Sequence, residues 1–209
     1  MSKDKLKPLE HATLWDSFRG GSDEAFSRLY ELFAADLYRY GYNLVRNKQV
    51  VEDCLHELFL HLHSHRSRLG PTDNIQFYLY RALRRRLTDT ISKLNKLDSE
   101  EYVFDRAEFL IQPYESQLID EQVVERQREI VIAELNKLPK RQKEILYLVY
   151  MKGLTYQQAS EVMDITMKSV YNSVNVALAT LRKYLQESFK REGLLLFLFI
   201  ISSIFIVFA

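Results

Sequence analysis

Residues 155–185 read TYQQASEVMDITMKSVYNSVNVALATLRKYL. Thr155 and Thr166 are both suited to cap a helix, because a threonine hydroxyl can accept a hydrogen bond from the free N–H groups of a first turn. The pattern predicts a short helix ending at Met163, a tight turn, and a long helix over about 167–189. Two helices joined by so short a turn indicate a helix-turn-helix.

The second of these helices has one apolar and one polar face. The residues expected to face the core are Val170, Val174, Ala177, Leu178 and Leu181. The residues expected to point outward are Lys168, Tyr171, Asn172 and Asn175. Asparagine can pair with adenine, and lysine with guanine or a phosphate, so this face is a candidate for reading DNA in the major groove.

A helix-turn-helix is a small module, and the chain before it has further helical patterns. Residues 22–45 predict an amphipathic helix with Ser22 as its cap. Its expected core face is Phe26, Tyr30, Phe33, Leu37, Tyr40 and Leu44. Residues 49–65 predict a second helix, with a buried stripe of Val51, Leu55, Leu58, Phe59 and Leu62. Its other face holds Glu52, Asp53, His56, Glu57 and Leu60.

After a turn at Gly70-Pro71, Asp73 or Asn74 is expected to cap a third helix, over about 74–94. Four arginines cluster between 81 and 86, near its middle, and Phe77, Tyr78 and Tyr80 stand before or at the edge of this cluster. Basic groups neutralise phosphates, and aromatic faces can stack on unpaired bases. This helix is therefore either a nucleic-acid contact or a solvated basic face over core aromatics.

Further on, a helix is expected over 115–137, and Pro139 suits the first turn of another, over 139–151. Gly 6 and Pro 4 are low counts for 209 residues, and the composition of 47% hydrophobic and 27% charged residues excludes a wholly disordered chain. Net charge is +3 over 1–93, −6 over 94–130 and +4 over 131–193. This distribution indicates two mildly basic modules joined by an acidic connector.

No enzyme motif is found in the sequence. There is no Gly-rich phosphate loop and no Ser/His/Asp arrangement. His61 and His65 have the spacing of a metal pair, but a structural site needs four ligands, so no metal and no cofactor are expected. Cys54, the single cysteine, is expected to be a core or boundary residue and excludes an internal disulfide. No secretory signal is expected, since residues 1–10 lack an apolar run.

Two stretches, 50–93 and 138–185, together resemble the sigma-70 family of bacterial RNA polymerase sigma factors, in its extracytoplasmic-function (ECF) group. The first, VVEDCLHELFLHLHSHRSRL followed by NIQFYLYRALRRRLTDTISK, is similar to the family's region 2. The second, which starts at LPKRQKEILYLVYMKGLTYQQ, is similar to region 4. The resemblance implies an all-α fold of two helical domains joined by a linker, with no catalytic residues.

The resemblance also implies partners and residue roles. The partners are core RNA polymerase, through its β′ clamp helices and β flap, and promoter DNA. An anti-sigma factor is a further candidate partner, which the sequence neither requires nor excludes. The polymerase-binding residues are Asp53, His56 and Glu57. The residues for the −10 element are Tyr78, Arg81, Arg84, Arg85, Arg86 and Asp89. The residues for the −35 element are Lys168, Tyr171, Asn172 and Asn175.

This chain departs from the family pattern at particular positions. His56 and Arg85 stand where relatives have Gln and Asn, and Asp164 stands where the turn usually has Gly. Ser173 and Val176 replace side chains that are often basic. The recognition helix therefore has only Lys168 near its start, so its attraction to phosphates should be weak.

Residues 194–209 read LLLFLFIISSIFIVFA, sixteen residues without a charge. As a helix this run spans about 24 Å, short of a hydrocarbon core of about 30 Å, and basic residues precede it. Three interpretations compete: an anchor that tethers a cytoplasmic protein to the inner face of the membrane, burial against protein, and a truncated or artefactual end.

The sequence therefore predicts a region 2-like domain at 9–94, an acidic linker at 95–114, a region 4-like helix-turn-helix domain at 115–189 and the apolar helical tail. A promoter-specificity subunit is the leading hypothesis. The alternatives are a helix-turn-helix transcription regulator, and a membrane-associated adaptor with degenerate sigma modules. The helices at 49–65 and 74–94 distinguish a promoter-specificity subunit from a transcription regulator, because a regulator needs neither helix.

Overall fold

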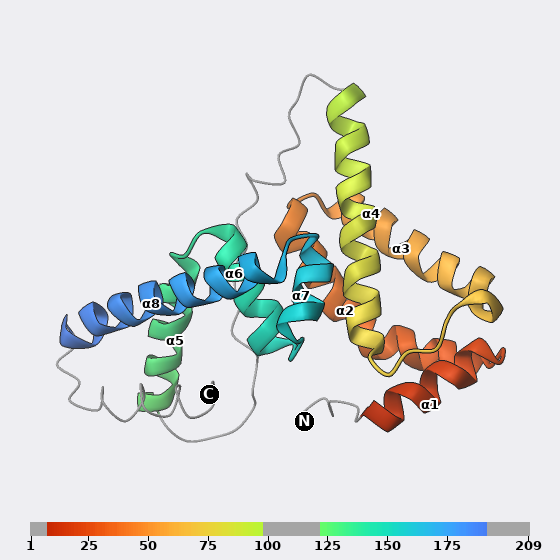
Figure 1. The fold of residues 1–209 in the computed structure, drawn as a ribbon, viewed down its shortest axis with the longest axis horizontal. Helices are drawn as coiled ribbons and strands as arrows, with labels where there is room; N and C mark the ends of the chain where they lie inside the picture. Colours follow the sequence, from red (N-terminus) through yellow and green to blue (C-terminus); the bar gives the residue numbers. More distant parts are fainter. Residues whose placement is uncertain (1–7, 98–121, 192–209) are drawn as a thin grey trace. The chain divides into compact units, whose positions relative to one another are not determined.

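The computed structural model describes residues 8–97 and 122–191, and these residues form helices and no strand (Figure 1). The all-α prediction is confirmed. The chain divides into two compact units. The first contains α1 to α4 together with residues 157–165, and the second contains α5, α6 and α8.

The first unit is a small helical bundle. Its elements are α1 (Pro8–Arg19), α2 (Asp23–Val45), α3 (Lys48–His65), the 3₁₀ turn η1 (Arg66–Arg68) and α4 (Ile75–Leu97). The helices α2, α3 and α4 each contact the other two, and α1 lies against α2 and α4. The third predicted helix thus extends three residues beyond its expected end at 94.

The three main helices of this unit each begin at a side-chain cap. The capping oxygens belong to Ser22, Asn47 and Asn74, and each accepts from the backbone N–H three residues ahead, at 3.0, 3.1 and 2.9 Å. Such a cap satisfies one of the four N–H groups that a helix start leaves unpaired. The predicted cap at Ser22 is confirmed, and of the two candidates after the Gly-Pro turn it is Asn74 that caps α4.

The close approach of α2 to its neighbours depends on Gly41. A Cβ atom at this position would lie 3.0 Å from Val51 of α3 and 3.3 Å from Leu87 of α4. Both distances are shorter than ordinary van der Waals contact, so a larger residue at this point would force the Val51 and Leu87 side chains to shift. The buried positions of α2 include Leu29 and Phe33, whereas Tyr30, predicted to face the core, is 52% exposed.

Helix α1 has no counterpart among the helices predicted from the sequence. Its two anchors are Trp15 and Phe18, both completely buried. The Trp15 indole donates a hydrogen bond to the Gly70 carbonyl at 2.8 Å. The same ring lies 5.3 Å from Phe18 and 5.1 Å from Tyr78, centroid to centroid. A single side chain thus ties α1 to the loop before α4 and to α4 itself.

The second unit is built from α5 (Gln122–Asn136), α6 (Lys140–Leu146) and α8 (Met167–Arg191), with α5 and α6 both packed on α8. One apolar cluster joins Ile130 to Leu181 and Leu185. Another joins Leu138 and Leu146 to Ala177, with the partly exposed Leu178 beside it.

The helix predicted over 139–151 is interrupted. Pro139 precedes α6 as its N-cap residue, and α6 gives way to a π-helical turn, η2 (Tyr147–Met151). A π turn holds an extra residue, so it rotates the apolar face. Within it Tyr147 and Leu148 are buried, whereas Val149 and Tyr150, the next two residues, are partly exposed.

Three predicted segments lie partly or wholly outside the described residues. They are the acidic linker from 98 onward, the first residues of the helix expected over 115–137, and the apolar tail 194–209. Within the described residues, no helix combines the length and the apolar character that a membrane crossing requires.

We predict that Trp15→Ala lowers the free energy of unfolding by about 3–5 kcal/mol, the usual range for removing a buried tryptophan. Urea denaturation measures the change. Circular dichroism is used to follow unfolding, because the variant lacks the chain's single tryptophan and tryptophan fluorescence cannot report on it. Leu9→Ala, at a side chain on α1 that is 78% exposed, should change stability by less than about 0.5 kcal/mol. Equal effects of the two changes would contradict the role given to Trp15.

Candidate nucleic-acid interface

A buried stripe on α4 determines which of its side chains reach solvent. The buried residues are Ile75, Leu79, Tyr80, Leu83, Leu87 and Ile91, each no more than 5% exposed. A spacing of four residues keeps such side chains on one helical face. The arginines between them are therefore displaced to the sides and the outer face of α4.

The predicted −10 residues on α4 divide into exposed and partly buried groups. Arg81, Arg85 and Asp89 are exposed, whereas Arg84 and Arg86 are partly buried. The Arg81 guanidinium lies 3.0 Å from the Glu161 carboxylate, and both residues belong to the first unit. Arg85 makes no ion pair with any residue in the described part of the chain. Among the four arginines predicted for the −10 element, Arg85 is thus the one most available to a phosphate.

The aromatic residues of α4 are less available than the sequence suggests. Tyr80 is 1% exposed and its ring lies 4.8 Å from the ring of Tyr40, so it belongs to the core. Tyr78 is partly buried against Trp15, and burial raises the pKa of its phenol. The interpretation of these tyrosines as stacking platforms is therefore wrong for Tyr80, and for Tyr78 only part of the ring is accessible.

The outer face of α3 carries the residues predicted to bind polymerase. Asp53, His56 and Glu57 are all exposed, and Leu60, one turn further on, is 56% exposed. The predicted buried stripe of α3 is confirmed in full. Gln49 donates a hydrogen bond to the Asp53 carboxylate at 2.9 Å, which orients this carboxylate along the helix. The face is acidic with an apolar residue at one end.

One ion pair connects the α3 face to the α4 face. The Arg86 guanidinium lies 3.5 Å from the Glu57 carboxylate. The Arg86 side chain is 28% exposed and that of Glu57 is 65% exposed. Arg86, predicted as a DNA contact, therefore also holds α4 against α3, and its positive charge offsets the negative charge of Glu57 at the boundary between the two faces.

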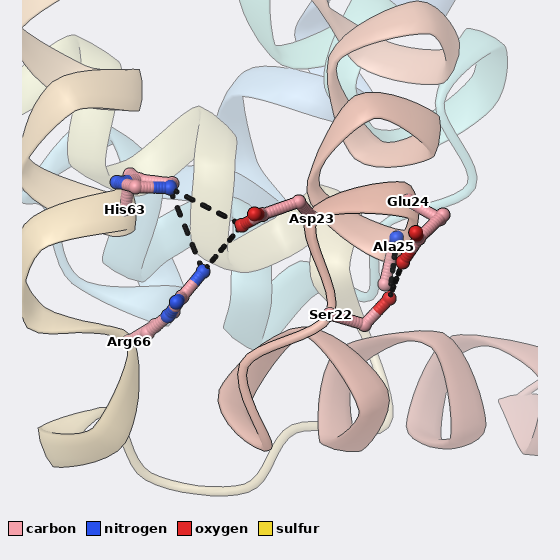
Figure 2. A network of polar contacts seen from close by, with 6 residues as sticks. All are labelled: Ser22, Asp23, Glu24, Ala25, His63 and Arg66. Carbon is pink, nitrogen blue, oxygen red and sulfur yellow. Dashed lines mark hydrogen bonds and ion pairs between the residues drawn. The ribbon is translucent and has the colours of Figure 1, made fainter.

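A second polar network fixes the far end of α3 to the start of α2 (Figure 2). Figure 2 shows the Asp23 carboxylate between His63 and Arg66, at 3.5 and 2.7 Å, beside the Ser22 cap. The hydrogen bond and the charge of Arg66 lower the pKa of Asp23. An acidic group in the first turn of α2 also complements the helix dipole. Within this network the negative charge of Asp23 is paired with the positive charge of Arg66, so we assign the network a structural role.

The histidine and cysteine side chains of α3 do not form a metal centre. The rings of His61 and His65 stack at 4.3 Å, and the pKa of His61 is lowered by burial and by His65. Within the described residues, no group of three or more His, Cys, Asp or Glu side chains is placed to hold a metal ion. Cys54 is buried beside Thr90, and burial raises the pKa of its thiol, which disfavours the reactive thiolate.

The helix-turn-helix begins with α7 (Tyr156–Met163), which directly follows Thr155. The turn after α7 depends on Asp164, whose φ of 53° is left-handed, and on a hydrogen bond from the Ile165 N–H to the Ser160 carbonyl. Aspartate tolerates this conformation better than most residues, so the turn forms without glycine. Thr166 then caps α8 by accepting from the Ser169 N–H at 3.1 Å.

The outer face of α8 agrees with its predicted composition. Lys168, Tyr171, Asn172 and Asn175 are all exposed. Val170, Val174 and Ala177 are buried as predicted, each no more than 1% exposed. Met167 and Val176 are also more than half exposed, so two apolar side chains lie on this surface beside the polar ones.

Comparisons with known proteins identify both parts of the chain. Residues 29–97 match the family described as sigma-70 region 2, and residues 125–187 match the family described as sigma-70, region 4. The ECF RNA polymerase sigma factor SigM of Bacillus subtilis (strain 168) is 26% identical over 145 residues, which cover 66% of this chain and 81% of that protein.

Two solved structures share the fold. The sigma factor RpoE from Bartonella quintana, in complex with the anti-sigma factor NepR, has a TM-score of 0.54 at 18% identity, over 77% of this chain and 96% of that chain. CnrH, in complex with the cytosolic domain of CnrY, has a TM-score of 0.53 at 16% identity, over 85% of this chain and 97% of that chain.

In the part of the chain that the structure describes, the helical fold, the arginines of α4 and the helix-turn-helix are the features expected of a DNA-binding protein. The matches at both parts of the chain go further: the chain belongs to the sigma-70 family, in the ECF group. It is a sigma factor that directs promoter recognition and transcription initiation. A conventional helix-turn-helix regulator, the main alternative, has no need of a region 2 over residues 29–97.

Proposed function

We propose that the exposed face of α3 binds core RNA polymerase while the outer face of α4 holds the opened −10 strand. The observation that carries this proposal is the opposite charge of the two exposed faces. Asp53 and Glu57 lie on α3, and Arg81 and Arg85 lie on α4. The acidic face would meet a basic protein surface, since the charge pattern of an interface is complementary, and DNA would attract the cationic face.

Each face has a defined part in this proposal. On α3, Asp53, His56 and Glu57 contact the β′ clamp helices, and the exposed Leu60 adds apolar area to the same contact. On α4, Arg85 neutralises a phosphate of the non-template strand. The helix α8 reads the −35 element with Lys168, Tyr171, Asn172 and Asn175, and the second unit meets the β flap.

We expect the chain to supply binding and positioning and no catalysis of its own, since polymerase carries the chemistry. The complexes of the similar structures, one of them with a partner described as an anti-sigma factor, support an anti-sigma protein as a further partner. The site of action would be the cytoplasm, where polymerase and DNA lie.

The polymerase contact is tested by charge reversal on α3. We predict that Asp53→Lys with Glu57→Lys raises the Kd of the full chain for core polymerase at least about tenfold, which corresponds to about 1.4 kcal/mol. Glu31→Lys is the matched control, because Glu31 is an exposed acid of α2 that pairs only locally with Arg28. Titration of core polymerase by fluorescence anisotropy measures the affinity.

Loss of the Glu57–Arg86 ion pair is a second explanation for weaker binding, and a further variant separates the two. Asp53→Lys and Glu57→Lys combined with Arg86→Glu restore an ion pair between α3 and α4 with reversed polarity. Binding should stay weak in this variant, because the acidic group at position 57 is still missing. Recovery of binding would contradict a direct contact, and so would equal affinity of the α3 variant and the control.

The strand-opening role is tested at Arg85. We predict that Arg85→Ala reduces the open-complex fraction several-fold and lowers the slope of log affinity against log salt by about 0.7, the value for one lost single-strand phosphate contact. Permanganate reactivity of unpaired thymines measures opening by the holoenzyme. Arg28→Ala, at an exposed arginine of α2, should leave both quantities unchanged. An unchanged salt slope for Arg85→Ala would rule out the phosphate contact.

The apolar tail is the basis of a separate proposal, which rests on its sequence alone. Sixteen uncharged residues at 194–209, preceded by Lys190 and Arg191, fit a tether to the cytoplasmic face of the membrane. We predict that residues 1–209 remain with membranes after an alkaline carbonate wash, whereas residues 1–193 are released. Release of both chains would instead favour burial of the tail against protein.

A further inference from the structure

The exposed face of α8 is short of cations where it would enter the major groove. From Met167 to Leu181 the only charged residue is Lys168, and the next cations are Arg182 and Lys183. Guanine is read mainly by arginine or lysine through its O6 and N7 atoms. A helix with a single cation along four turns can therefore make that contact at only one position.

The centre of the face is a row of residues that successive turns bring into line. Lys168, Asn172, Asn175 and Ala179 are exposed and lie at helical positions three or four residues apart, opposite the buried Val170, Val174 and Ala177. At 1.5 Å per residue this row is about 16 Å long, the length of about five base pairs at 3.4 Å each. The face is thus matched to one short run of base pairs.

The two asparagines supply the chemistry for adenine. An asparagine amide can donate to N7 and accept from N6 of the same adenine, a bidentate pairing. Both amides are exposed, and neither makes a hydrogen bond with a side chain in the described part of the chain. They can therefore turn toward a base without first breaking an internal bond.

Apolar groups line both sides and the far end of the row. Val176 is 54% exposed on one side, Tyr171 is 56% exposed on the other, and Ala179 stands at the end. Apolar groups contact the thymine C5-methyl favourably. The Tyr171 ring packs edge-on against Tyr156 at 6.3 Å. Tyr156 in turn interacts with Tyr150 through a side-chain hydrogen bond, so the position of Tyr171 is held by its neighbours.

We infer that α8 is specific for an upstream element of A·T base pairs that holds at most one G·C pair, at the end that faces Lys168. Asn172 and Asn175 read adenines, and Val176, Ala179 and Tyr171 contact thymine methyl groups. This inference rests on the proposed −35 role of α8 and names the base pairs that this role requires.

The test is a selection with the assembled holoenzyme. Core polymerase and the full chain transcribe a pool of templates in which the upstream and the downstream promoter elements are both randomised, and the transcripts and their templates are sequenced. We expect the enriched upstream elements to hold about five positions, nearly all A·T, with G·C tolerated at one end. Enrichment of two or more G·C pairs, or no upstream preference, overturns the inference.

Variants assign the preference to single residues. Asn172→Ala and Asn175→Ala should each relax one adenine position by about tenfold, within the range for one bidentate pair. Gln186→Ala is the matched control, an exposed amide three turns beyond Asn175 on the same helix, and should change nothing. Asn175→Arg should convert the preferred base at its position to guanine. Unchanged preferences in the asparagine variants contradict the assignment.

The outcomes also separate this inference from the function on which it rests. If the holoenzyme selects downstream elements and initiates, but ignores the upstream element, the sigma role stands and the assignment to α8 fails. If the full chain yields no promoter-dependent transcript from any template in the pool, the proposed function itself fails. Selection of a G·C-rich upstream element keeps the −35 role and overturns only the base preference.

Discussion

The packing of α4 against α2 and α3 is the constraint on which the first unit depends. The buried stripe from Ile75 to Ile91 takes one side chain from every turn into the core. Full burial of each leucine or isoleucine contributes about 1.5–3 kcal/mol, far more than any exposed ion pair. The stripe therefore decides the rotation of α4, and the positions of the arginines follow from that rotation.

The same constraint connects folding to function. Gly41 lets α2 approach both α3 and α4, so the buried stripes of all three helices share one core. With those stripes inside, the acids of α3 and the arginines of α4 have only the outer surface left. Arg86 and Glu57 meet at the boundary between the two faces and pair. In α8 the buried Val170, Val174 and Ala177 likewise leave the two asparagines outside.

Periodicity alone predicted much of this arrangement, because apolar spacing fixes which face of a helix is buried. The stripe of α3 and the exposed polar face of α8 were accessible in that way, and the start of α8 after its cap Thr166 followed from capping chemistry. Periodicity could not choose between the adjacent Leu29 and Tyr30. It missed α1, because the two anchors of this helix have polar neighbours in the sequence and their partners, such as Gly70 and Tyr78, lie far along the chain.

Other features depend on how one helix is aligned with another, and this alignment cannot be predicted from any single stretch of sequence. The Glu57–Arg86 pair spans two helices, and the burial of Tyr80 depends on Tyr40. The π-helical turn at Tyr147 has no local sequence signal that spacing rules detect. The residue patterns alone left a helix-turn-helix transcription regulator as an alternative function. The resemblance at 50–93 and 138–185 is what identified the family.

The central claim is that two oppositely charged faces make this chain a promoter-specificity subunit, and that the buried stripes of α3 and α4 determine where these faces lie. Run-off transcription of fragmented genomic DNA tests this claim most directly. Core polymerase is compared with and without the full chain, and the 5′ ends of the transcripts are mapped. We predict that the chain directs initiation to a small set of start sites that share sequence motifs upstream. Start sites that are the same with and without the chain would contradict it.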